Sequence, residues 1–228
     1  MMPCMCKNVV IFDLDDTLCK EIDFLKSAYR HIASLVSGES ISEDDVYRML
    51  WQAYQRGDNA FESVIRKYGF QLFTVQWMLN VYRNHKPRIV LCDEVKMTLE
   101  KLKSDDVILG IISDGRYIQQ MNKIEALGLR DCIHENDIII NTDKEHIKPD
   151  LRSYKYFMDK YGDGCDFWYV GDNTAKDFIA PNSLGWTTVC LLDDGRNIHE
   201  QNFNLDDIYL PQYQIKQMKE LPDLLRAI

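Results

Sequence analysis

The chain has 228 residues, of which 46% are hydrophobic and 28% are charged, and its formal net charge is −9. These proportions are typical of a globular protein and exclude a disordered or low-complexity chain. No apolar run approaches the roughly 18 residues that a membrane span requires, and the acidic balance argues against a nucleic-acid or anionic-membrane partner, which would need clustered Lys and Arg.

The seven cysteines are scattered along the chain and form no pair with the C-x-x-C spacing of a structural zinc site. Their odd number disfavours a disulfide framework. The first residues lack the long apolar stretch of a secretory signal. These features predict reduced thiols in a cytoplasmic protein, while the oligomeric state is not determined by the sequence.

The first predicted element is a short buried strand at 9–12, because its residues are apolar and largely β-branched. It runs into three carboxylates within the next four positions. Residues two apart in an extended chain point the same way, so Asp13 and Asp15 can share one site, and the Thr17 hydroxyl can hold the turn. Carboxylates are costly to bury alone, so such a cluster either faces solvent, binds a cation or carries out chemistry.

Residues 19–88 follow helical periodicity. Ser42 followed by Asp45 predicts a capping box at one helix, and Asn59 is the predicted N-cap of the next. The segment is rich in aromatic residues, which predicts a compact helical subdomain with its own core. Its expected helices lie near 22–36, 46–54, 61–68 and 73–82.

From residue 89 onward, apolar strands and helices alternate, which implies a parallel sheet covered on both faces. The predicted strands lie at 107–112, 138–140, 167–170, 187–192 and 213–215. Pro181 is tolerable only within a first helical turn, which predicts a short helix starting near Ala180. The predicted fold is therefore α/β. A Rossmann-like parallel sheet core with helices on both faces comprises residues 1–18 and 89–228, and an all-helical cap comprises residues 19–88.

Polar residues follow the predicted strands at their carboxyl ends, where parallel sheets bind ligands. Taken separately they are weak signals, since each is compatible with a plain turn, a surface cation or a helix cap. Together with the first carboxylates they predict one site at one rim of the sheet. The residues are Ser113 and Asp114 after one strand, Lys148 before a helix, and Asp172, Asn173 and Asp177 after a later strand.

On these residues the chain resembles the haloacid dehalogenase superfamily, whose four motifs it matches in order. The first motif, Asp-x-Asp-x-Thr-Leu, stands at 13–18, and the helical segment after it resembles the cap of the subclass that inserts one there. The other motifs correspond to Ser113, Lys148, and Gly171-Asp172-Asn173 with Asp177. The resemblance implies a phosphatase of this superfamily, that is, a phosphoric monoester hydrolase.

The resemblance also implies a Mg²⁺ cofactor and the residues that react. Asp13 would be the nucleophile that forms an aspartyl-phosphate, and Asp15 would be the general acid and base. The side chains of Asp13 and Asp172 and the backbone carbonyl of Asp15 would bind the metal.

Other residues are implied to bind phosphate or to support the site. Ser113, Asp114 and Lys148 would contact the phosphate. Thr17, Asn173 and Asp177 would support the metal ligands from behind. Arg116 is the best candidate for a contact with the leaving group, because it directly follows Ser113-Asp114-Gly115.

The acid at position 15 argues for phosphoester hydrolysis rather than dehalogenation. The expected substrate is a small phosphorylated metabolite, either a sugar phosphate or a nucleoside monophosphate. A phosphomutase or phosphotransferase of the same superfamily, a receiver-like phospho-acceptor domain and a non-catalytic relative stay open. The long loop at 193–206 has no assigned role.

Overall fold

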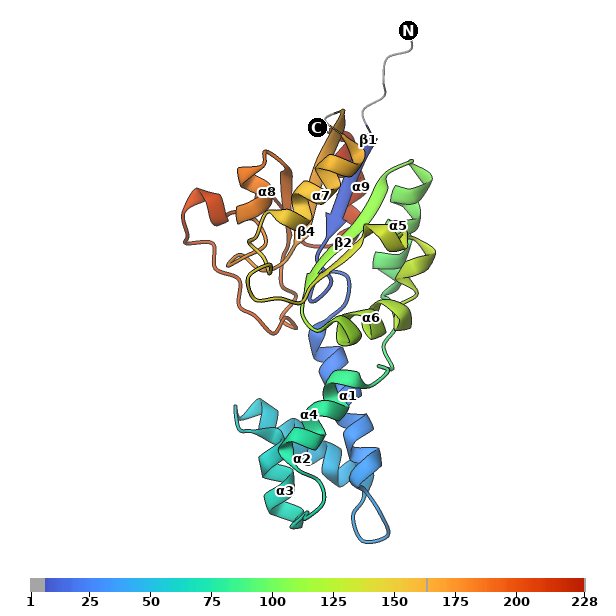
Figure 1. Cartoon of the computed structure of the whole chain (residues 1–228), viewed down its shortest axis with the longest axis vertical. Helices are drawn as coiled ribbons and strands as arrows, with labels where there is room; N and C mark the ends of the chain where they lie inside the picture. Colours follow the sequence, from blue (N-terminus) through green and yellow to red (C-terminus); the bar gives the residue numbers. More distant parts are fainter. Residues whose placement is uncertain (1–6, 163, 228) are drawn as a thin grey trace.

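The computed structural model describes residues 7–162 and 164–227, and within them six parallel strands form one sheet in the order β3-β2-β1-β4-β5-β6 (Figure 1). The strands are β1 (Lys7–Phe12), β2 (Ile108–Asp114), β3 (Ile138–Asn141), β4 (Cys165–Gly171), β5 (Thr187–Leu191) and β6 (Tyr213–Ile215). The chain runs outward from β1 to β3 and then returns to β4 on the other side of β1. This reversal places the crevice at which open α/β sheets bind ligands beside the carboxyl end of β1.

Alternate residues of β1 pack against helices on opposite faces of the sheet, as the pleat of a strand requires. Val10 and Phe12 belong to the apolar cluster that includes Leu99 of α5 (Asp93–Ser104). Their neighbours along the strand instead join the cluster that includes Phe157 of α7 (Arg152–Tyr161). Burial on both faces explains why the strands are almost continuously apolar. The prediction of an α/β parallel sheet with helices on both faces is confirmed.

The remaining helices of the core also match the predicted pattern. They are α6 (Tyr117–Ala126), α8 (Ile179–Ser183) and α9 (Leu221–Ala227), with short 3-10 helices at Leu129–Asp131, Glu135–Asp137, Asp207–Tyr209 and Met218–Glu220. Pro181 lies in the first turn of α8, where its missing N–H has no helical partner to lose, so the prediction of a short helix near Ala180 is confirmed. None of the described helices combines the length and the apolar character that a membrane span requires.

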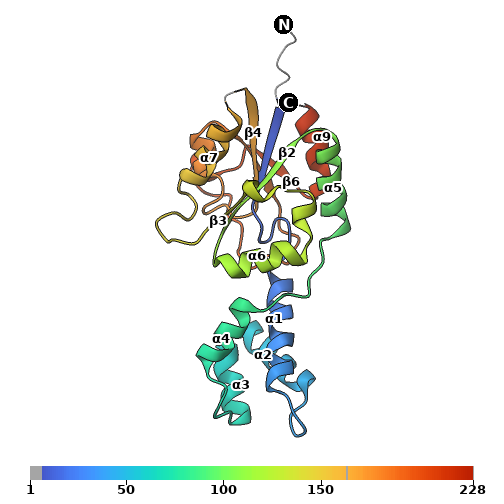
Figure 2. The same cartoon turned by 45° about the vertical axis from the view of Figure 1, so that its right-hand side comes forward.

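Four further helices lie between β1 and α5 in the chain and form a separate layer beside α6 (Figure 2). They are α1 (Glu21–Val36), α2 (Glu43–Gln55), α3 (Ala60–Tyr68) and α4 (Val75–Asn84). Their inward faces share one apolar cluster, with Ile32, Leu50, Val64 and Met78 among its buried members. Figure 2 shows two connections to the sheet, one entering α1 and one returning from α4 to α5. The division into residues 1–18 with 89–228 and residues 19–88 stays a prediction, and residues 1–6 lie outside the described part.

The two predicted helix caps have different outcomes. The Asn59 side chain accepts a hydrogen bond from the Glu62 N–H at 3.2 Å, as predicted. Ser42 is the N-cap residue of α2, but its side chain makes no capping hydrogen bond, so the predicted capping box with Asp45 is wrong. Asp45 instead pairs with Arg48 one helical turn later, at 3.1 Å. The three acidic residues of the first turn still favour the helix through its dipole.

Candidate active site

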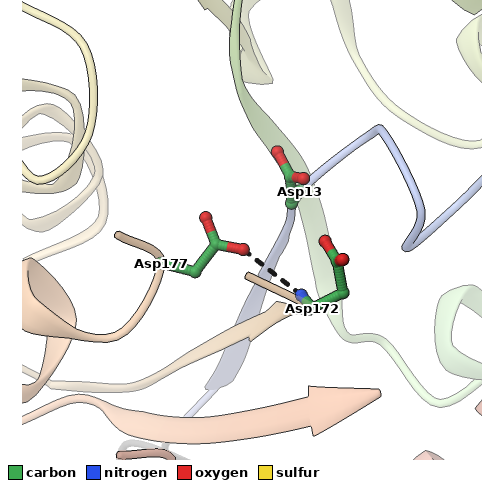
Figure 3. A group of neighbouring side chains, drawn as sticks. All are labelled: Asp13, Asp172 and Asp177. Carbon is green, nitrogen blue, oxygen red and sulfur yellow. Dashed lines mark hydrogen bonds between the residues drawn. The ribbon is translucent and has the colours of Figure 1, made fainter. Parts of the chain in front are cut away.

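The carboxyl ends of β1 and β4 bring Asp13 and Asp172 together (Figure 3). The Asp13 N–H donates to the Val170 carbonyl at 2.8 Å, so the sheet pairing continues one residue past β1 and fixes the first carboxylate beside β4. One carboxylate oxygen from each of Asp13, Asp172 and Asp177 lies within 4.8 Å of the others, and all three residues are buried. A cluster of hard oxygen donors at this spacing fits Mg²⁺, so the donor set agrees with the predicted cofactor.

Asp177 supports this cluster through hydrogen bonds with Lys148 and with the backbone after β4. One of its oxygens accepts the backbone N–H groups of Asp172 and Asn173 at 3.2 and 2.9 Å, and the other accepts from Lys148 at 2.7 Å. A Cβ at Gly171 would lie 2.6 Å from the Asp177 carboxylate, so only glycine fits there. Because both Asp177 oxygens already have donors, the contacts suit a residue that holds the loop at Asp172 rather than one that binds the metal.

Burial raises the pKa values of Asp13 and Asp172, whose carboxylates lie close together. Desolvation, with the nearby Asp177 and Asp13 carboxylates, raises the pKa of Asp172 to about 9. Desolvation also raises the pKa of Asp13 to about 7, although Lys148 opposes that change. Both shifts reflect negative charges that are held close together in a poorly hydrated place, and a divalent cation there would favour the ionised forms.

Lys148 lies inside this cluster rather than on its surface. Its ammonium donates to Asp13 at 2.6 Å, to Asp177 at 2.7 Å and to the Tyr169 hydroxyl at 3.1 Å, and its side chain is fully buried. Burial alone would disfavour the charge, but Asp13 and Asp177 outweigh it and raise the pKa of Lys148. Lys148 therefore lies within hydrogen-bond distance of Asp13, the predicted nucleophile. It is not among the residues that line the cavity described below.

Asp15 faces two residues that the sequence analysis missed, Lys123 and Gln120 of α6. Lys123 is fully buried and donates to one Asp15 oxygen, and Gln120 donates to the other at 2.8 Å. Burial would raise the pKa of Asp15, but the Lys123 charge and these hydrogen bonds hold it below its ordinary value. Gln120 also donates to the Ser113 hydroxyl at 2.7 Å, so α6 ties the ends of β1 and β2 together.

The other predicted residues lie close to this centre, with one exception. Asp114 accepts from the Lys148 N–H at 3.1 Å and pairs with Lys176 at 3.1 Å. The Thr17 hydroxyl lies 3.5 Å from an Asp172 oxygen. Asn173 accepts the Ala175 N–H at 3.0 Å and so shapes the loop after β4. Arg116 is the exception, because it is exposed at the N-cap of α6 and does not line the cavity.

A cavity of about 180 Å³ opens over these groups. Its lining includes six predicted residues: Asp13, Asp15, Ser113, Asp114, Asp172 and Asn173. Asp16, Glu21, Lys176 and His199 also line it and were not predicted as site residues. A larger hollow of about 890 Å³ lies beside α1 and the chain returning from α4, but it includes none of the carboxylates Asp13, Asp15 and Asp172. The smaller cavity is therefore the candidate active site.

Comparison with known proteins agrees with this geometry. The family model described as haloacid dehalogenase-like hydrolase matches residues 10–191. The chain belongs to this family. The match begins within β1 and ends with the last residue of β5, and it includes Asp13, Asp172 and Asp177.

Two similar proteins are named as phosphatases. A protein from Methanocaldococcus jannaschii named glyceraldehyde 3-phosphate phosphatase is 28% identical over 96% of this chain and 97% of its own length. One of the same name from Methanopyrus kandleri is 26% identical over 97% of this chain and 98% of its own. The hydrolase YfnB from Bacillus subtilis, solved bound to magnesium, has the same fold, with a TM-score of 0.63, 17% identity and coverage of 96% and 99%. The predictions of the superfamily and of a phosphoric monoester hydrolase are confirmed.

Proposed function

We propose that this enzyme is a Mg²⁺-dependent phosphatase that hydrolyses a small sugar phosphate of the glyceraldehyde 3-phosphate type through an aspartyl-phosphate on Asp13. The observation that supports this most is the meeting of Asp13, Asp172 and Asp177 at the crevice beside β1, with Asp15 in the same cavity. The names of the two relatives support the substrate class. Both relatives match this chain over nearly its whole length, cap segment included.

The first half of the proposed reaction transfers the phosphoryl group to the protein. An Asp13 oxygen bonds to phosphorus, the bond from phosphorus to the ester oxygen breaks, and Asp15 gives its proton to the departing alkoxide. Asp15 takes up this proton from solvent before the step. Lys123 holds the pKa of Asp15 below its ordinary value, and a phosphate dianion in the cavity would raise that pKa because like charges disfavour ionisation. Lys123 and Gln120 keep the carboxyl of Asp15 aimed at the cavity.

The second half returns the enzyme to its starting state. Asp15, now ionised, takes a proton from water while the water oxygen bonds to phosphorus, and the bond from phosphorus to Asp13 breaks. Ser113 and Lys176 line the cavity and would bind the phosphate oxygens. A bound Mg²⁺ would offset the negative charge shared by the phosphate and the carboxylates of Asp13 and Asp172.

Mg²⁺ should stabilise the protein more at high pH than at low pH. The pKa values of Asp13 and Asp172 are raised in the folded state, to about 7 and about 9, so the stability that these two groups contribute without metal is present below the ordinary Asp pKa and is lost as the pH rises through the raised values. The metal needs the ionised carboxylates. We expect saturating Mg²⁺ to raise the melting temperature by about 5–10 °C near pH 9 and by much less near pH 6.

Thermal unfolding of wild type and Asp172→Asn with and without Mg²⁺ checks this expectation. The variant should lose the metal-dependent rise at both pH values. An equal rise at both pH values, or a full rise in Asp172→Asn, would contradict the assignment of the metal to this cluster.

The proposed substrate class is tested by phosphate release from a matched panel. The panel comprises glyceraldehyde 3-phosphate, dihydroxyacetone phosphate, phosphoglycolate and a nucleoside monophosphate, each with Mg²⁺ and with EDTA. We expect the highest kcat/KM on a triose phosphate and no activity with EDTA. A higher kcat/KM on the nucleotide would reject the sugar phosphate, whereas isomerised product without phosphate release would indicate a mutase. One stoichiometric phosphorylation without turnover would indicate a phospho-acceptor domain.

A further inference from the structure

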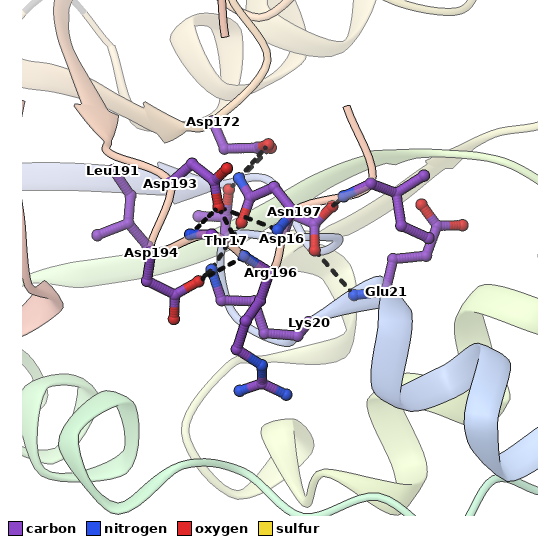
Figure 4. Close-up of polar contacts among 12 residues, drawn as sticks. Asp16, Thr17, Lys20, Glu21, Asp172, Leu191, Asp193, Asp194, Arg196 and Asn197 are labelled. Carbon is purple, nitrogen blue, oxygen red and sulfur yellow. Dashed lines mark hydrogen bonds and ion pairs between the residues drawn. The ribbon is translucent and has the colours of Figure 1, made fainter. Parts of the chain in front are cut away.

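Residues 193–201 are the first part of the loop at 193–206, which had no assigned role, and they lie between Asp172 and the start of α1 (Figure 4). The loop begins after Leu192, one residue beyond the end of β5, and its first residue holds it in a fixed turn. One Asp193 oxygen accepts the backbone N–H groups of Gly195, Arg196 and Asn197 at 2.8, 3.0 and 3.0 Å. The loop is therefore a built element with defined contacts rather than an irregular connection.

On one side, this loop contacts the proposed metal ligand Asp172. The Asn197 amide donates to an Asp172 carboxylate oxygen at 3.0 Å (Figure 4). The Gln201 amide donates to the Asp172 backbone carbonyl at 2.9 Å. The loop thus binds both the side chain and the main chain of the same residue.

On its other side, the loop contacts the start of α1. Lys20, the N-cap residue of α1, donates to the Asn197 amide oxygen at 2.7 Å and pairs with Asp194 at 3.0 Å. Arg196 donates to both oxygens of Asp23 in the first turn, at 2.7 and 2.6 Å. Each contact joins segments more than 170 residues apart in the chain.

Asp16 strengthens the same connection. One of its oxygens accepts the Glu21 N–H at the first residue of α1, and the other accepts the Ile198 N–H of the loop, both at 2.9 Å. Thus one side chain bonds to both α1 and the loop. A movement of α1 relative to the sheet would change the environment of Asn197.

The Asn197 amide has only one orientation that satisfies both of its partners. Lys20 can only donate, so it requires the amide oxygen, and the Asp172 carboxylate requires the amide NH₂. This bond occupies one Asp172 oxygen and limits the rotation of the carboxylate. Groups that hold a metal ligand in this way commonly change metal affinity by 10–100-fold when they are removed.

We propose that Asn197 is a positioning residue for Asp172, that Lys20 orients it, and that the loop at 193–201 thereby couples the position of α1 to the metal site. The exposed Arg196–Asp23 pair contributes little to stability by itself, so its use is to hold the loop against α1. The inference rests on the proposed function, because it takes Asp172 as a metal ligand.

The test is direct titration of the full-length protein with Mg²⁺ in a calorimeter, without substrate. We expect Asn197→Ala to weaken Mg²⁺ affinity by about 10–100-fold. Lys20→Met, which keeps the apolar stem of the side chain, should weaken it in the same direction. The double variant should be no weaker than Asn197→Ala, because Lys20 acts through Asn197 and the two effects are then non-additive.

Asn204→Ala is the matched control, since Asn204 is exposed in the same connection and its side chain makes no hydrogen bond within the described residues. It should bind Mg²⁺ like wild type. All variants should keep the metal-free melting temperature of wild type, which shows that they fold. Wild-type affinity in Asn197→Ala, or additive losses from Lys20→Met and Asn197→Ala, would overturn the inference. Failure of the wild type itself to bind Mg²⁺ would overturn the proposed function, and the inference with it.

Discussion

Asp13→Asn should lower kcat by roughly 10⁴-fold or more, the scale seen when a nucleophile is removed. The amide cannot form the aspartyl-phosphate, and no other carboxylate can replace it in position. Asp15 is held by Lys123 and Gln120, and Asp177 is fully bonded by Lys148 and two backbone N–H groups. Phosphate release under saturating substrate and Mg²⁺ measures the effect.

Asp15→Asn provides the matched contrast at the neighbouring acid. It leaves the nucleophile in place but removes the group that accepts the proton of water, so the phosphorylated enzyme should form slowly and persist. Acid quenching with a substrate labelled in its phosphate should therefore recover label on Asp15→Asn and none on Asp13→Asn. Label on Asp13→Asn, or turnover near the wild-type rate, would show that another residue is the nucleophile.

Much of the fold and the centre of the site follow from one regularity of parallel sheets. Each apolar run long enough to be a buried strand ends in a polar residue, and the carboxyl ends of such strands meet. That argument places Asp13, Ser113 and Asp172 near one another without any knowledge of contacts, and the structure has them around one cavity. It succeeds because burial decides which segments form central strands, and the apolar runs of the sequence display that burial directly.

The sequence also contains a signal for the two residues that orient Asp15, Gln120 and Lys123. Helix α6 buries positions 120, 123 and 124, and its C-cap residue Leu127 continues this helical stripe, in which Gln120 and Lys123 are polar. A lysine in an otherwise buried stripe needs an anion, and Asp15 is that anion. Polar residues on the inward face of this helix therefore indicate Gln120 and Lys123 as site residues.

Other contacts gave no such signal. The hydrogen bond from Asn197 to Asp172 depends on the path of a loop whose sequence has no periodicity. The hydrogen bond from Lys20 to Asn197 joins residues that are 177 positions apart. Ser42 is the opposite case. The sequence has the local pattern of a capping box there, but the Ser42 side chain makes no capping hydrogen bond. Local patterns give preferences of about 1 kcal/mol, which the surroundings of a helix end can outweigh.

Lys148→Met should lower both activity and stability. Its ammonium lies between the buried carboxylates of Asp13 and Asp177, so removing it leaves two negative charges without their cation. Breaking such a buried pair commonly costs about 3–5 kcal/mol of unfolding free energy. The pKa of Lys148 is raised in the folded state, so this stabilisation is fully present near neutral pH and is lost only as the pH rises through the raised value.

The loss of activity should exceed what instability explains, because Lys148 holds one oxygen of the proposed nucleophile. We expect kcat/KM per folded enzyme to fall by about 10²–10³-fold, the usual effect of one preorganised donor. Lys160→Met is the control, since Lys160 forms a partly buried pair with Asp137, and neither residue lines the cavity. Urea unfolding should show that both variants are destabilised, whereas kcat/KM should fall only in Lys148→Met. Normal kcat/KM in a destabilised Lys148→Met protein would mean that this lysine stabilises the acidic cluster without aiding the reaction, and Asp13 would then need another group to orient it.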